Sequence, residues 1–188
     1  MQIKQIMDKI ISRKLLEIES KGFIKGGHNG PYYDEETPVR NTAHWAVIFS
    51  YYYKKTNQKR YYDAVKLCGD YLLSKEARPM NGTFFCRYNT NKDFVNGIIG
   101  QAWAIEGLVA VYDTTSDEKY IQAAREVFLM LPFDQNNKLW SVIDIDGSRK
   151  GFDMTFNHQL WFATSGVLIL SKKNDSEIYK RCRCFFNN

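Results

Sequence analysis

Two stretches of the chain repeat one another and decide its fold: Tyr51–Leu73, YYYKKTNQKRYYDAVKLCGDYLL, and Ala110–Leu131, AVYDTTSDEKYIQAAREVFLML. A shift of 59 positions brings identical residues into register, namely Tyr53 and Tyr112, Thr56 and Thr115, Tyr61 and Tyr120, and Ala64 and Ala123. The same shift applied again reaches SKKNDSEIYKR, from Ser171 to Arg181. Self-similarity at a fixed period indicates a repeat architecture built from one supersecondary unit.

Each unit is predicted to be an αα-hairpin. Its first helix is apolar nearly all round, which favours burial on more than one side, and its second helix has one charged face. The expected first helices, which we call inner, are Asn41–Lys55, Asn96–Asp113 and Asn157–Ser171. The expected second helices, which we call outer, are Gln58–Ser74 and Asp117–Leu131. We expect Asn57 and Ser116 to be N-caps of the second helices. A third outer helix is expected to begin at Asp175 and to be cut off at KRCRCFFNN.

The loops between hairpins are long and carry strand-like runs. These are TFFCRY (Thr83–Tyr88) and LWSVIDIDGS (Leu139–Ser148), the latter with a turn signal at Asp146–Gly147. Long loops at one end of every hairpin are where function usually lies. The fold class predicted here is all-α, an αα-hairpin array with short β-hairpins in its loops.

Composition narrows the class of protein. The 188 residues are 44% hydrophobic and suit one domain, 1–188, with an amphipathic helix at 1–21 that has no signal-peptide core. The net charge of +5 is concentrated in an atypical basic tail, 172–188, so we expect no nucleic-acid partner. No run reaches transmembrane length, and the four cysteines form neither a metal-ligand spacing nor a disulfide framework. We therefore expect a cytoplasmic protein without a membrane partner, metal or cofactor.

One aspartate precedes each expected inner helix: Asp34, Asp93 and Asp153, at spacings of 59 and 60. In a curved array these positions should converge on one rim. Two carboxylates in different surroundings can act as a proton donor and a base. The alternative is that each aspartate only caps a helix, a role that the helix dipole also favours.

Aromatic and polar side chains follow the aspartates along the inner helices. Tryptophan faces beside carboxylates and amides are what a sugar-binding cleft needs, and the amides here are Asn96, Gln101, Asn157 and Gln159. Tryptophans and histidines also occur as core residues. The candidate substrate-binding residues are Asp34, His44, Trp45, Gln101, Trp103, Asn157, His158 and Trp161.

Three segments carry a resemblance to a known group of enzymes: NGPYYDEETPVRNTAHW, KDFVNGIIGQAWAIEGLVAVYDTTSDEKY and GFDMTFNHQLWFA. They resemble the six-hairpin (α/α)6-toroid carbohydrate enzymes, and are most similar to unsaturated glucuronyl and rhamnogalacturonyl hydrolases. The resemblance implies that Asp93 and Asp153 form the catalytic pair. One would protonate the vinyl-ether double bond of an unsaturated uronic-acid oligosaccharide and activate water, while the other assists. Arg40, Arg87 or Arg149 would pair with the uronate carboxylate.

The chain is short for a complete toroid of six hairpins. Six such hairpins need roughly twice the 188 residues present, so we expect a truncated chain or half of a split protein. A homodimer or a partner chain would then complete the toroid. One alternative function is a sugar 2-epimerase-like isomerase using His44 and His158. Another is a non-catalytic fragment or helical binding module.

Overall fold

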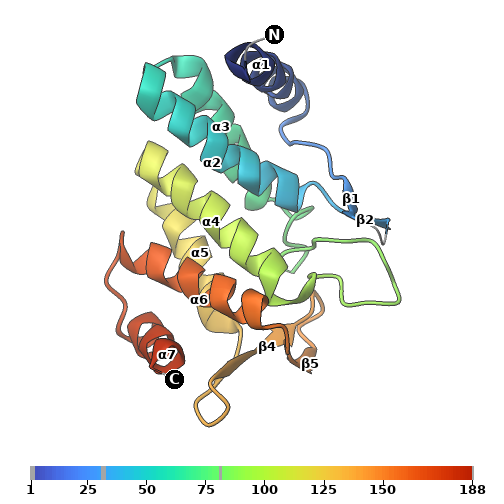
Figure 1. The fold of residues 1–188 in the computed structure, drawn as a ribbon, viewed down its shortest axis with the longest axis vertical. Helices are drawn as coiled ribbons and strands as arrows, with labels where there is room; N and C mark the ends of the chain where they lie inside the picture. Colours follow the sequence, from blue (N-terminus) through green and yellow to red (C-terminus); the bar gives the residue numbers. More distant parts are fainter. Residues whose placement is uncertain (1–2, 31–32, 81, 188) are drawn as a thin grey trace.

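The computed structural model describes residues 3–30, 33–80 and 82–187, and in these residues it contains seven α-helices. They are α1 (Ile3–Lys21), α2 (Val39–Thr56), α3 (Lys59–Leu72), α4 (Gly97–Thr115), α5 (Glu118–Met130), α6 (Phe156–Leu170) and α7 (Ser176–Phe186). Helices α2, α4 and α6 lie side by side and run in the same direction, and α3 and α5 lie behind them (Figure 1). The prediction of an all-α, αα-hairpin array is confirmed. Of the expected 1–21 helix, Met1 and Gln2 lie outside the described residues.

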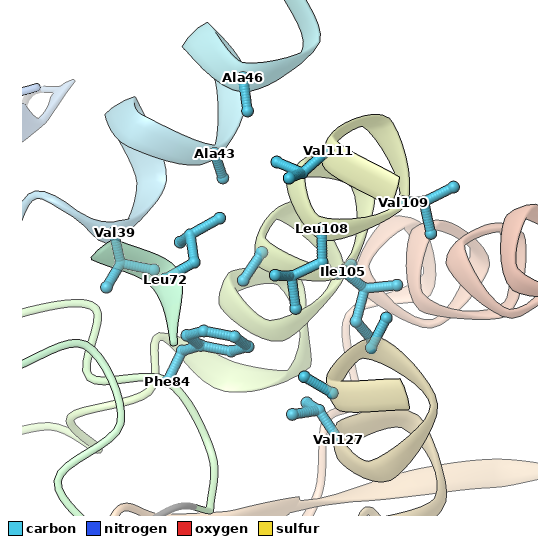
Figure 2. Close-up of a cluster of buried hydrophobic side chains, with 14 of the residues drawn as sticks. Val39, Ala43, Ala46, Leu72, Phe84, Ile105, Leu108, Val109, Val111 and Val127 are labelled. Atoms are coloured by element: carbon cyan, nitrogen blue, oxygen red, sulfur yellow. The ribbon is translucent and has the colours of Figure 1, made fainter. Parts of the chain in front are cut away.

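Helix α4 lies at the centre of the core because it contacts α2 and α6 on its flanks and α3 and α5 behind. Its buried side chains therefore occur on nearly every side of the helix. Figure 2 shows how Val39, Leu72, Leu108 and Val127 gather from α2, α3, α4 and α5. Each fully buried aliphatic side chain of this size contributes about 1.5–3 kcal/mol. The core thus fixes the three inner helices beside one another.

The prediction that the residues between the two helices of each hairpin are N-caps is wrong. Asn57 and Ser116 are not N-caps but C-caps of α2 and α4, with φ of 53° and 57°. Asparagine adopts the left-handed conformation readily, and a residue in that conformation ends a helix. The N-cap of α5 is Asp117, whose carboxylate accepts a hydrogen bond from the backbone N–H of Lys119.

The prediction that the third outer helix is cut off at KRCRCFFNN is also wrong. Helix α7 is not cut off but continues to Phe186, because Ile178, Cys182 and Phe185 recur at helical spacing and are buried. Asp175 caps the helix by accepting hydrogen bonds from the N–H groups of Glu177 and Ile178. The described part of the 172–188 segment is therefore a third outer helix, packed against α6 and α5.

The loops contain two small antiparallel sheets. One pairs β1 (His28–Asn29) with β2 (Asp34–Glu35), and the other orders β3 (Phe133–Asp134), β4 (Leu139–Ile143) and β5 (Arg149–Phe152). The predicted turn at Asp146–Gly147 joins β4 to β5, with Gly147 at φ 81°. The predicted strand at 83–88 does not form; only an isolated bridge links Glu36 to Arg87.

A polar side chain at the same position of each inner helix holds the loop in front of it. In each case one side chain bonds both the N–H and the C=O of a single loop residue. The three pairs are Thr42 with Ile24, Gln101 with Phe84, and Gln159 with Trp140. Trp140 lies in β4 and Phe84 in a loop, so the clamp acts on strand and loop backbone alike.

Charged residues join the opposite, C-terminal ends of the inner helices. Lys54, Asp113 and Lys172 stand 59 positions apart, and Asp113 receives hydrogen bonds from both lysines. Burial alone would raise the pKa of Asp113, but the bonds from Lys172 and Lys54 outweigh it and lower the pKa below the ordinary value. We call this row the charge ladder.

None of the helices in the described ranges is long and apolar enough to cross a lipid bilayer.

Candidate functional site

The N-terminal ends of α2, α4 and α6 meet the long loops at one end of the array (Figure 1). A pocket of about 550 Å³ opens there, which we call the rim pocket. Its lining residues are Arg40, Arg87, Lys92, Asn96, Ile99, Trp103, Thr155, Asn157, His158 and Trp161. Seven of these were named as site candidates from the sequence: Arg40, Arg87, Asn96, Trp103, Asn157, His158 and Trp161.

The structure brings Asp93 and Asp153 to the same helix end, beside the rim pocket. The Gly97 N–H donates to Asp93 Oδ1 (2.7 Å), and the next amide, Ile98 N–H, donates to Asp153 Oδ2 (3.1 Å). Gly97 has a φ of 60°, and a Cβ at this position would lie 2.4 Å from Asp153 Oδ2. Only glycine therefore lets both carboxylates approach the first turn of α4.

Asp93 is bound tightly by an arginine of its own loop. Arg87 Nη2 donates to Asp93 Oδ2 (2.5 Å), Arg87 Nε donates to the Asp93 carbonyl (2.6 Å), and Arg87 Nη1 donates to Asn96 Oδ1 (2.9 Å). All three nitrogens of the guanidinium are thus used within the loop that precedes α4. The arrangement makes Arg87 a brace for that loop.

Asp153 has a different partner. Its Oδ1 accepts a hydrogen bond from the Thr155 N–H (3.0 Å), and its Oδ2 lies 2.9 Å from Nδ1 of His158. The Asp153 side chain is 8% exposed, whereas the His158 side chain is 29% exposed and lines the rim pocket. When Nδ1 carries the proton in this contact, the lone pair of the neutral ring is on Nε2. Such a pair can accept or donate a proton at its histidine end.

Asp34 does not cap α2 as the other two aspartates cap α4. It lies in β2 and accepts hydrogen bonds from Lys92 Nζ (2.5 Å) and Asn89 Nδ2 (2.6 Å). The bond from Lys92, followed by that from Asn89, holds the pKa of Asp34 below its usual value. Asp34 therefore fixes Lys92 at the edge of the rim pocket.

Two cationic side chains at the pocket are more exposed to solvent than the acidic side chains with which they pair. The side chains of Arg40 and Lys92 are 32% and 39% exposed, whereas their partners Glu36 and Asp34 are 4% and 6% exposed. Arg40 uses Nη1 for Glu36 (2.9 Å), and its Nε and Nη2 make no hydrogen bond to any described residue. Its guanidinium lies 4.4 Å above the ring of Trp103. This pocket thus offers cationic donors to an anion.

Aromatic side chains form a row across the three inner helices. His44, Trp103 and Trp161 contact one another in sequence: the His44 and Trp103 ring centroids are 5.7 Å apart, and those of Trp103 and Trp161 are 6.5 Å apart. The two indole planes are nearly perpendicular, at 88°. His44 is mostly buried, and this burial, followed by the charge of Arg40, lowers its pKa. It does not line the pocket.

Several predicted site residues are not at the pocket. Gln101 is fully buried and bonds only to backbone and to Cys86, Trp45 packs against Phe49, and Arg149 donates to Ser141 Oγ. Sequence reasoning missed Lys92, Ile99 and Thr155, which line the pocket. Two of them could have been found because Lys92 is adjacent to Asp93 and Thr155 lies two residues after Asp153. No group of three His, Cys, Asp or Glu side chains within the described ranges could hold a metal ion.

Comparison with known sequences gives one relative but no family. No family model matches the chain. The chain is 46% identical over 169 residues to Archaeal glycosylation protein Q of Haloferax volcanii. The match covers 90% of this chain and 45% of that protein, so the chain spans less than half the length of this relative.

Comparison with solved structures identifies the fold. Cellobiose 2-epimerase from Bacillus thermoamylovorans superposes with a TM-score of 0.71 at 12% identity, over 96% of this chain and 55% of the epimerase. An unsaturated glucuronyl hydrolase specific for heparin gives 0.62 at 15% identity, over 93% and 52%. An α-1,6-mannanase of Salegentibacter gives 0.61 at 15% identity, over 79% and 46%. All three are six-hairpin toroid enzymes, and the chain has the fold of about half of such a toroid.

Proposed function

We propose that the rim pocket binds a carbohydrate bearing a carboxylate, and that the chain supplies acid/base groups for a reaction on that sugar. The observation that carries this proposal is that two tryptophan side chains line one pocket together with Arg40, Lys92 and His158. Aromatic faces suit the C–H faces of sugar rings, and helix N-termini favour anions. The relative's description as a glycosylation protein agrees with a role in sugar metabolism.

Arg40 is the proposed ligand of the sugar carboxylate. The sequence left Arg40, Arg87 and Arg149 as equal candidates, but Arg87 is committed to Asp93 and Asn96, and Arg149 to Ser141. Arg40 keeps Nε and Nη2 for a bidentate pair with the substrate. Its ion pair with Glu36 and its stacking on Trp103 hold the guanidinium in one orientation before the sugar arrives.

The acid/base group at the pocket is then His158, with Asp153 as the residue that orients it. His158 is the more exposed of the two and belongs to the pocket lining. A histidine oriented by a carboxylate is suited to removing and returning a proton at a sugar carbon. The geometry therefore favours an epimerase-like isomerisation, which was only an alternative among the predictions from the sequence.

Hydrolysis of an unsaturated uronide is the second candidate, with Asp93 and Asp153 as the pair. It is favoured by the approach of both carboxylates to consecutive amides of α4, and by the exposure of the Asp93 side chain, 23%, beside the pocket. Two carboxylates held this way have different neighbours, an arginine and a histidine. Different neighbours are what acid/base division between like groups requires.

Two further proposals concern the partner of the chain and its location. We propose that a second copy or a partner chain supplies further hairpins, because the solved toroids superpose over only 46–55% of their own length. The cytoplasmic location is likewise a prediction. Light scattering of the purified chain tests the first: a discrete dimer supports a second copy, and a folded monomer contradicts it.

Binding is tested by the intrinsic fluorescence of the purified chain, since Trp103 and Trp161 lie in the pocket. We expect glucuronate to change the emission at concentrations where glucose does not. Arg40→Met should abolish this difference, whereas the matched variant Arg13→Met, on α1, should keep it. An equal response to both sugars, or none, would overturn the proposal and favour a binding module of another kind.

The reaction is tested by two readouts on the same sample. Deuterium uptake from D2O into the sugar without cleavage marks the isomerase, and loss of the double-bond absorbance of an unsaturated uronide marks the hydrolase. His158→Gln should abolish the first, with His28→Gln as control because His28 lies in β1. Asp93→Asn should abolish the second and spare the first.

A further inference from the structure

Glu106 is an acid on the inner helix α4 that neither candidate reaction uses. Its Oε1 accepts a hydrogen bond from the indole N–H of Trp161 on α6, with a distance of 2.7 Å. Glu106 also lines a second hollow, of about 450 Å³, further along the inner face toward the charge ladder. The bond between Glu106 and Trp161 therefore stands where the rim pocket and this second hollow meet.

Glu106 differs from Asp113, the other acid of the inner helices, because no cation among the described residues pairs with it. Asp113 has two lysines, but Trp161 is the one hydrogen-bond donor to Glu106 among the described residues. Burial raises the pKa of Glu106, and the bond from Trp161 only partly opposes this. A partly buried carboxylate loses some of its hydration, and the hydrogen bond from Trp161 replaces part of what is lost.

Trp161 needs an anchor because it is not enclosed by the core. It is 42% exposed, and its ring forms one wall of the rim pocket, nearly perpendicular to the ring of Trp103. An exposed indole can turn about its side-chain bonds, and a rigid aromatic wall binds with less loss of conformational entropy than a mobile one. The hydrogen bond to Glu106 fixes the edge of the ring that carries the N–H.

We propose that Glu106 is a positioning residue that locks the indole of Trp161 as a wall of the rim pocket. Its consequence for sugar binding rests on the proposed function, but the locking of Trp161 does not. The carboxylate acts through Trp161 and does not touch the sugar. A side chain of the same shape with an acceptor oxygen should replace it, and a side chain without an acceptor should not.

Two variants and two readouts test this proposal. Glu106→Gln keeps an acceptor oxygen, Glu106→Leu removes it, and Glu126→Leu on α5 is the control. The first readout is the indole N–H proton resonance of Trp161 by NMR, assigned by its disappearance in Trp161→Phe. We expect a small shift in Glu106→Gln and a large upfield shift with broadening in Glu106→Leu. An unchanged resonance in Glu106→Leu would overturn the proposal, whatever the sugar does.

The second readout is the affinity for glucuronate. We expect Glu106→Leu to weaken it about five- to tenfold, the usual effect of losing one positioning hydrogen bond, and Glu106→Gln to change it less than about twofold. A shifted resonance with unchanged affinity would overturn the role in binding while the proposed function stands. Absence of binding by the unaltered chain would refute the proposed function and leave the NMR result decisive for Trp161. Should Glu106→Leu not fold, Glu106→Ala takes its place, and an unchanged resonance in that variant would overturn the proposal.

Discussion

The segments in front of α4 and α6 follow one plan but use it differently. Each segment has an aspartate close to the start of the helix that follows. A buried glutamine within that helix bonds to the backbone of the segment. Asp93 is tied to Arg87 in a closed brace, whereas Asp153 faces His158 at the pocket. Repetition has therefore kept the frame while the partner of the acid has changed. Equal spacing in the sequence identifies equivalent positions, but the neighbouring residue decides what each position does.

The glutamine clamps are the shared part of the comparison and should give the largest effect. Gln101→Leu and Gln159→Leu each remove the side-chain acceptor of one buried N–H and the side-chain donor to two C=O groups, so each should lower the free energy of unfolding by about 3 kcal/mol. Urea unfolding followed by circular dichroism measures this, with the exposed Gln122→Leu as control. A loss below about 1 kcal/mol at either site would show that the two loops are not held alike.

Gly97 is the point where the two segments meet, and its substitution should have the next largest effect. Gly97→Ala adds a Cβ 2.4 Å from Asp153 Oδ2 at a φ of 60°, so it should cost about 2 kcal/mol. Gly147→Ala is the matched control, because Gly147 has a φ of 81° and nothing within 4 Å of an added Cβ. It should lose only about 1 kcal/mol. Equal losses in urea unfolding would mean that contact with Asp153 does not matter.

Substitutions of Arg87 and His158 distinguish the bracing residue from the candidate acid/base residue. Arg87→Met leaves Asp93 without its cation and should cost roughly 1.5 kcal/mol of stability, since the pair is partly buried. His158→Gln should change the unfolding free energy by less than about 0.5 kcal/mol while abolishing proton exchange on the sugar. Urea unfolding and deuterium uptake, measured on both variants, make the comparison. A strongly destabilised His158→Gln would assign both segments to bracing alone.

The charge ladder extends the comparison to the other end of the helices and should give the smallest effect. The folded state lowers the pKa of Asp113, so its contribution is fully present above the unfolded value of about 3.9 and is lost as the pH falls through the folded pKa. Asp113→Asn should therefore cost about 0.5 kcal/mol at neutral pH, because the lysines are partly exposed. This difference should vanish in strong acid. Stability curves of both proteins against pH test it, and a difference that grows in acid would contradict the assignment.

The architecture could be predicted because it depends on apolar periodicity, which the repeat displays three times. The reach of α7 could have been predicted from Ile178, Cys182 and Phe185 but was hidden by the basic residues between them. The failed strand at 83–88 could not be foreseen, because the backbone N–H groups of residues 85–88 bond to separate partners in other segments, Ala77, Phe94 and Glu35, and not to one neighbouring strand.

Seven of the ten residues that line the rim pocket could be named from the sequence, but the contacts that hold each of them could not. Trp103 and Trp161 fall out of register at a shift of 59 but into register at 58, the same spacing that relates Gln101 to Gln159. The long loop before α6 absorbs the missing residue, so both rings reach the same pocket. The choice of Arg40 over Arg87 depends on which guanidinium the loop has already engaged, and spacing carries no information on that.

The alternation of the charge ladder also limits which helices can be neighbours. Lysine, aspartate and lysine follow one another across α2, α4 and α6, so an inner helix that came to lie beyond α2 or α6 would meet a lysine at this level. A hairpin with an acid at the matching place would be attracted, and one with another lysine would be repelled. Hairpins that are otherwise alike thereby carry a matching rule for their order of assembly.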